Sequence, residues 1–67
     1  MEARKEDKIA LLKQKIQLVA NSIYVASVDA RVAKKVGDEN MESRAISDLK
    51  QFEMMRDAYE EELKLLE

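Results

Sequence analysis

The segment Gln17–Ala30, QLVANSIYVASVDA, decides the fold of this chain. It carries a single charge, Asp29, although 39% of the 67 residues are Asp, Glu, Lys or Arg. Apolar surface is costly to leave in water, so we expect other protein to cover this segment.

The apolar residues of the segment belong to a longer pattern that repeats every three and four residues. This spacing is the heptad of a helix that packs against another helix. A strand over residues 23–28, which are rich in β-branched side chains, is the alternative. The heptad crosses these residues unbroken and no turn residue bounds them, so helix is favoured. The heptad positions are Ile9, Leu12, Ile16, Val19, Ile23, Ala26, Ala30 and Ala33.

A turn is predicted at Gly37, the only glycine in a chain without proline. Lys34 and Lys35 precede it, and cations in a last turn followed by glycine are typical of a helix C-terminus. Asp38 or Asn40 can then cap a second helix. We expect helices over about residues 3–36 and 40–66, joined by a turn over residues 37–40.

The second helix carries its own apolar seam, and a short turn between long helices makes them antiparallel neighbours. The fold class is therefore all-α, a single helical-hairpin domain over residues 1–67. Folding about the turn places Phe52 near Ile23 and Ala26, and Ile46 near Ala30. The seam residues are Ala45, Leu49, Phe52, Arg56, Tyr59, Leu63 and Leu66.

Charge also favours this pairing of the two helices. Eight basic and four acidic residues precede Gly37, whereas four basic and ten acidic residues follow it. Opposite charges beside the two seams disfavour pairing of like with like, although each exposed pair contributes little.

Composition indicates that the hairpin needs a further partner. A chain of this length buries so little apolar surface that the isolated monomer is only marginally stable. It has no Cys for disulfides and no His, the commonest metal ligand and general base. Oligomerisation is the remaining route to stability.

A second apolar set on the first helix gives that partner a surface. With it, the apolar arc spans roughly 160°, more than one neighbouring helix can cover. The simplest solution is a homodimer of hairpins forming a four-helix bundle with the first helix central. The predicted interface residues are Leu11, Leu18, Val25, Val28 and Val32.

Catalytic, cofactor-binding and metal-binding residues are not predicted, because no phosphate loop or nucleophile motif is present. Four carboxylates on one side of the second helix are assigned to a solvated acidic face rather than a cation site. Arg56 is expected at the seam edge with its head in water, paired with Glu53 or Glu60. Asn21, Ser22 and Ser27 are expected to set register or bond to backbone carbonyls. The four carboxylates are those of Glu53, Asp57, Glu60 and Glu61.

Nucleic-acid binding is the alternative carried by basic residues early in the first helix. In plan, the predicted dimer resembles the Rop-type plasmid copy-control hairpin, a four-helix bundle that binds RNA; the resemblance is one of architecture. Only three aromatic residues are available for base stacking, and the net charge is −2, so this alternative is not preferred. The basic residues are Arg4, Lys5, Lys8, Lys13 and Lys15.

We therefore expect a non-enzymatic, cytoplasmic adaptor or regulatory protein of the viral or accessory kind. It would act as a homodimer that binds another protein, with no cofactor and no membrane span, since its longest uncharged run is too short and no signal peptide is evident. A purely structural assembly subunit is a further alternative. Met41, Met54 and Met55 are either packing residues or an adaptable recognition surface.

Overall fold

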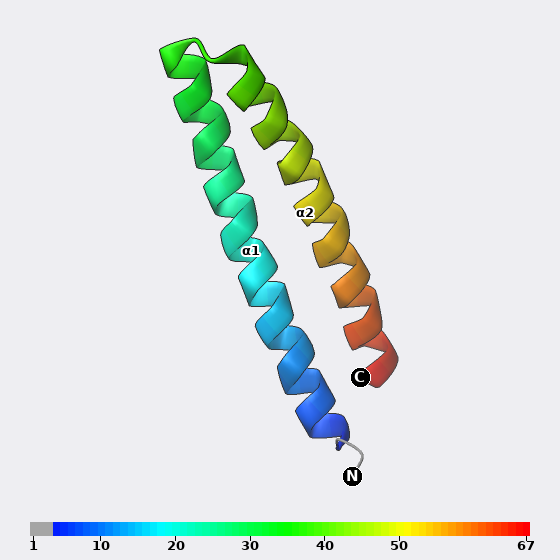
Figure 1. Ribbon diagram of the computed structural model, residues 1–67. Helices are drawn as coiled ribbons and strands as arrows, with labels where there is room; N and C mark the ends of the chain where they lie inside the picture. The colour runs from blue at the N-terminus through cyan, green and yellow to red at the C-terminus, as the bar shows by residue number, and fades with distance from the viewer. Residues whose placement is uncertain (1–3) are drawn as a thin grey trace.

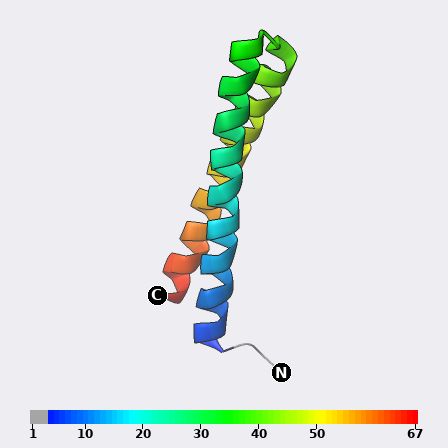
Figure 2. The ribbon, with the colours of Figure 1, turned by 90° about the vertical axis from the view of Figure 1, so that its left-hand side faces the viewer.

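The computed structural model describes residues 4–67 and consists of two long α-helices that pack side by side. Helix α1 (Lys5–Val36) and helix α2 (Glu39–Leu66) run antiparallel, so that Lys5 and Leu66 lie at the same end of the molecule (Figure 1). The predicted hairpin is confirmed, and the described residues contain no strand. Viewed from the side, the two helices cross at a shallow angle (Figure 2).

The boundaries of the helices differ slightly from those predicted. The expected start of the first helix, at residue 3, lies outside the described residues, within which α1 begins at Lys5. Helix α2 begins at Glu39, so the turn consists of Gly37 and Asp38 only. The turn is shorter than predicted because Asp38, rather than Asn40, caps α2 by accepting a hydrogen bond from the backbone N–H of Met41 at 3.0 Å.

Gly37 ends α1 in the left-handed conformation, with φ 78° and ψ 23°. The backbone N–H of Gly37 donates to the carbonyl of Lys34 at 3.3 Å, and that of Asp38 donates to the carbonyl of Ala33 at 2.9 Å. These two bonds form a Schellman motif, which satisfies carbonyls at the end of a helix. The chain thus reverses within two residues.

The two seams meet as the heptad pattern predicted. Every seam residue of either helix is buried or half-buried. The buried ones, however, are Val19 and three alanines, Ala26, Ala33 and Ala45. Ala45 is buried as a seam residue, whereas the adjacent Ile46 is 43% exposed. The core is therefore narrow, and most large side chains retain some exposure.

The hairpin is a single layer, one helix thick. The Cα trace measures 51 × 18 × 14 Å, with a radius of gyration of 15.5 Å. A compact chain of this length has a radius of gyration of about 11 Å. Domains generally bury their apolar faces between two layers. Within residues 4–67, no second layer packs against either broad face of the hairpin.

Candidate protein-binding face

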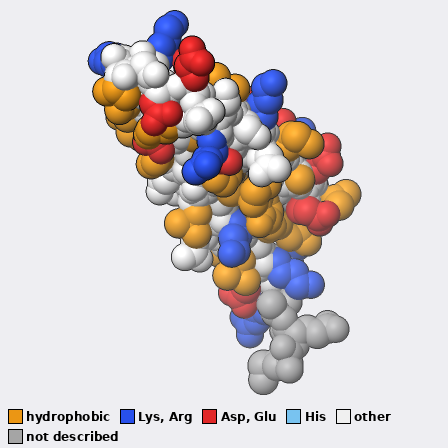
Figure 3. Space-filling view, turned by 45° about the horizontal axis from the view of Figure 1, so that its top comes forward, with side chains coloured by type: hydrophobic (Ala, Val, Ile, Leu, Met, Phe, Trp, Pro, Cys, Tyr) orange, Lys and Arg blue, Asp and Glu red, His pale blue; other side chains and the backbone are white. Residues whose placement is uncertain are grey.

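The predicted interface residues of α1 lie at the surface, where nothing in the hairpin covers them. Leu11, Leu18, Val25 and Val32 are 57%, 53%, 55% and 44% exposed, and Val28 is half-buried. The first four repeat every seven residues, so they form one continuous line along α1. We call these four residues, together with Val36 one turn beyond Val32 on the same face, the apolar stripe. Figure 3 shows hydrophobic side chains gathered at the surface and separated by single charged ones.

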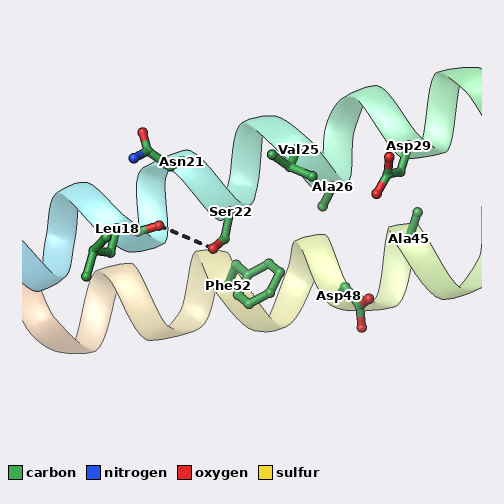
Figure 4. Close-up of a pocket in the computed structure, with 9 residues that line it drawn as sticks. All are labelled: Leu18, Asn21, Ser22, Val25, Ala26, Asp29, Ala45, Asp48 and Phe52. Atoms are coloured by element: carbon green, nitrogen blue, oxygen red, sulfur yellow. Dashed lines mark hydrogen bonds between the residues drawn. The ribbon is translucent and has the colours of Figure 1, made fainter.

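A groove of about 390 Å³ runs between the helices beside the stripe. Leu18 and Val25 form one wall, and the small side chains of Ala26 and Ala45 leave room at its base. Phe52 of α2 lines the groove together with Ser22 and Ala26 of α1 (Figure 4). The groove is open and mostly apolar, and this form suits the side chains of another helix.

Two acidic side chains mark the groove, one from each helix. Asp29 of α1 is half-buried and Asp48 of α2 is exposed, and both line the groove (Figure 4). Arg44 lies beside them at the end nearer the turn. None of the three takes part in an ion pair shorter than 4.0 Å with another residue of the described chain.

Asp29, Asp48 and Arg44 were not among the predicted site residues. The signal for Asp29 was available in the sequence, because Lys15, Ser22, Asp29 and Val36 also repeat every seven residues. Each lies four residues after a member of the first line, so the two sets share one face of α1. All members of this second set except Val36 are polar or charged, so a search for apolar residues alone does not find it.

Ser22 and Ser27 bond to backbone carbonyls, as predicted, whereas Asn21 bonds to a side chain. The hydroxyl of Ser22 donates to the carbonyl of Leu18 at 3.2 Å, and that of Ser27 donates to the carbonyl of Ile23 at 2.9 Å. Asn21 accepts a hydrogen bond from the side chain of Gln17 at 3.1 Å. Each of these bonds joins residues four apart within α1, the local pattern expected of Ser and Asn side chains in a helix.

Arg56 occupies the seam as predicted, but its expected partner was wrong. It is half-buried, and its Nε lies 3.4 Å from Oδ1 of Asp57 rather than near Glu53 or Glu60. This is the only ion pair shorter than 4.0 Å among residues 4–67. The complementary charges of the two helices therefore act over longer distances, where solvent and salt screen them.

The remaining candidate groups are spread over the surface. All four carboxylates of the acidic face of α2 are exposed, and no group of three or more acidic side chains in the described chain is arranged to hold a metal ion. The five early basic residues are likewise exposed. Met54 and Met55 lie about 20 Å along α2 from Met41, so the three methionines do not form one surface.

Comparisons with protein families, curated proteins and solved structures give no match to this chain. Neither helix within residues 4–67 has a stretch long and apolar enough to cross a membrane. Function must accordingly be argued from the geometry of the hairpin.

Proposed function

We propose that this protein is a non-enzymatic, oligomeric helical hairpin that acts as a protein-binding adaptor or regulatory protein. The observation that supports the proposal is the exposed apolar stripe, which lies on one helix and in which Leu11, Leu18, Val25 and Val32 repeat every seven residues. A contiguous apolar surface of this kind usually marks a protein interface. We place its action in the cytoplasm, consistent with a small chain that contains no cysteine.

The surface area of the hairpin supports the same conclusion. A compact monomer of 7.7 kDa exposes about 4,300 Å². This hairpin exposes 5541 Å², about 1,200 Å² more than that expectation. A stable protein interface buries about 800 Å² on each partner. The hairpin thus has more than enough surplus surface for one such interface, along a face that is already apolar.

The test is to place a charge in the middle of the stripe. Val25→Asp should abolish association, because an unpaired carboxylate would be buried in the interface. We expect the dissociation constant measured by sedimentation equilibrium to rise at least a hundredfold, with a fall in helicity by circular dichroism at micromolar concentration.

Tyr24→Asp is the matched control, because Tyr24 is the adjacent residue, is 68% exposed and lies off the stripe. It should associate like the wild type. A wild-type protein that is a fully helical monomer at micromolar concentration would contradict the proposal. A Val25→Asp variant that stays associated would place the interface elsewhere on the hairpin.

A further inference from the structure

The apolar stripe lies on a face of α1 that carries two opposite charges at opposite ends. Lys15 lies near the start of this face and Asp29 near its end, between the apolar members of the stripe. Lys15 is exposed, and Asp29 is half-buried beside the groove. Neither takes part in an ion pair shorter than 4.0 Å with any residue from 4 to 67.

We propose that a second copy of this chain covers the stripe, with its α1 running antiparallel and with Lys15 of each copy paired with Asp29 of the partner subunit. The inference rests on the proposed function, to which it adds the identity of the occupant, its direction and the residues that select it. The charges on α1 and the length of the stripe specify this occupant and its direction.

Charge favours the antiparallel direction. In a parallel pair of α1 helices, each residue faces its own copy, so Lys15 would meet Lys15 and Asp29 would meet Asp29. Both contacts are repulsive, and like charges brought together in an interface are costly. Reversing one helix exchanges both repulsions for two identical attractive pairs. A symmetric dimer has this property, because its two-fold axis generates each contact twice.

The length of the stripe sets the register. The stripe extends from Leu11 to Val36, so it covers itself completely when Leu11 faces Val36 of the partner subunit. In this register, Lys15 faces Val32 of the partner subunit, three residues from Asp29. Three residues are about 4.5 Å along a helix axis. A lysine side chain spans this distance easily, with its aliphatic part against the valine and its ammonium at the carboxylate.

Two further features fit this register. The two-fold axis passes close to Ser22 and Val25, so the small Ser22 side chain faces Val25 of the partner subunit and allows the helices to approach closely. Lys8 extends past the end of the partner's α1, toward Asp38 of the partner subunit in the turn and Glu39 of the partner subunit at the start of α2. A polar residue in the interface between two helices is also a known means of fixing register at some cost in stability.

Charge reversal tests the pairing directly. Lys15→Asp and Asp29→Lys should each weaken the dimer at least tenfold by sedimentation equilibrium, because each replaces two attractive contacts with two repulsive ones. The double variant Lys15→Asp/Asp29→Lys restores opposite charges and should return to within about threefold of the wild type. Arg31→Asp, which makes the same change in net charge on an exposed position off the stripe, is the control and should have little effect.

Cysteine pairs provide a second readout that does not depend on affinity, and the chain contains no native cysteine to interfere. The single variant Leu11→Cys should not form a disulfide-linked dimer on oxidation, because the two Leu11 positions lie at opposite ends of the antiparallel pair. The double variant Leu11→Cys/Val36→Cys should do so. The geometry of a disulfide requires Cα atoms within about 7 Å.

The outcomes separate the inference from the proposed function. The antiparallel pairing is refuted if Leu11→Cys alone forms a disulfide-linked dimer efficiently, or if the double charge variant dimerises as weakly as the single variants. The proposed function still stands in either case if Val25→Asp abolishes association. A wild type that remains a helical monomer at about 100 μM would refute the inference that a second copy covers the stripe. This holds whether or not a foreign chain binds it. Circular dichroism on each charge and cysteine variant, at a concentration at which it is associated, verifies that the hairpin is folded.

Discussion

Gly37→Ala should destabilise the hairpin by about 1 kcal/mol, and the reason is local to the turn. Gly37 has φ 78°, which a residue with a side chain adopts at a cost of about 1–2 kcal/mol. A Cβ added there meets no atom within 4 Å, so no steric term adds to this cost. Alanine also restricts the unfolded chain, which returns about 0.4–1 kcal/mol. The net loss is therefore about 1 kcal/mol.

The assay is thermal unfolding followed by circular dichroism at 222 nm, with every variant at the same protein concentration, since association makes Tm depend on concentration. A loss of about 1 kcal/mol corresponds to roughly 5 °C for a domain of this size. Gly37→Asn should lose less, because asparagine tolerates the left-handed conformation. Gly37→Val should lose more, because a β-branched residue there is a true outlier.

Two results would refute this reasoning. A loss well above 3 kcal/mol for Gly37→Ala would mean that the methyl group meets neighbouring atoms, contrary to the open surroundings of the turn. An unchanged Tm for both Gly37→Ala and Gly37→Val would mean that residue 37 does not need the left-handed conformation, and that the Schellman motif does not end α1.

Three other substitutions test the core and the caps by the same thermal assay. Asp38→Ala should cost about 1 kcal/mol through loss of the hydrogen bond to the Met41 N–H, whereas Asp38→Asn should be nearly neutral. Ala33→Leu should cost about 1–3 kcal/mol, because Ala33 is 0% exposed and the extra side chain has no space; an unchanged Tm would contradict the tight packing beside the turn. Arg56→Leu should be neutral or raise stability by up to about 1 kcal/mol, because it fills a seam position with an apolar group and gives up only an exposed pair with Asp57; a loss above 2 kcal/mol would show that the guanidinium has a structural partner.

Most of the fold was predictable because it depends on periodicity and on one glycine. The heptad from Ile9 to Ala33 and the matching seam on α2 specify two helices that must face each other. Gly37 specifies where the chain reverses. These signals are local in sequence and redundant, so low helix propensity around Val25 did not disturb them.

The details that were wrong or missed depend on side-chain geometry. The partner of Arg56 is decided among several carboxylates of similar energy within reach of a flexible side chain, and sequence spacing does not rank them. Ile46 was expected near Ala30 but is 43% exposed, and how far a residue beside the seam is covered depends on how α2 is rotated against α1. Asp29 was recognised as the only charge in its segment, but its place beside the groove needed the position of α2.

The distribution of the buried residues also determines how the hairpin opens. Ala26, Ala33 and Ala45 lie in the half of the molecule nearer the turn, whereas Val19, near the middle of α1, is the only other buried residue among residues 4–67 and the seam residues toward Lys5 and Leu66 are half-buried. Closing the chain near Gly37 has a low entropic cost, because the loop is only two residues long. Pairing of the two helices should start at the turn during folding, and local unfolding should begin at the end with Lys5 and Leu66. Amide hydrogens around Ala33 and Ala45 should therefore exchange with solvent more slowly than those around Leu12 and Leu63.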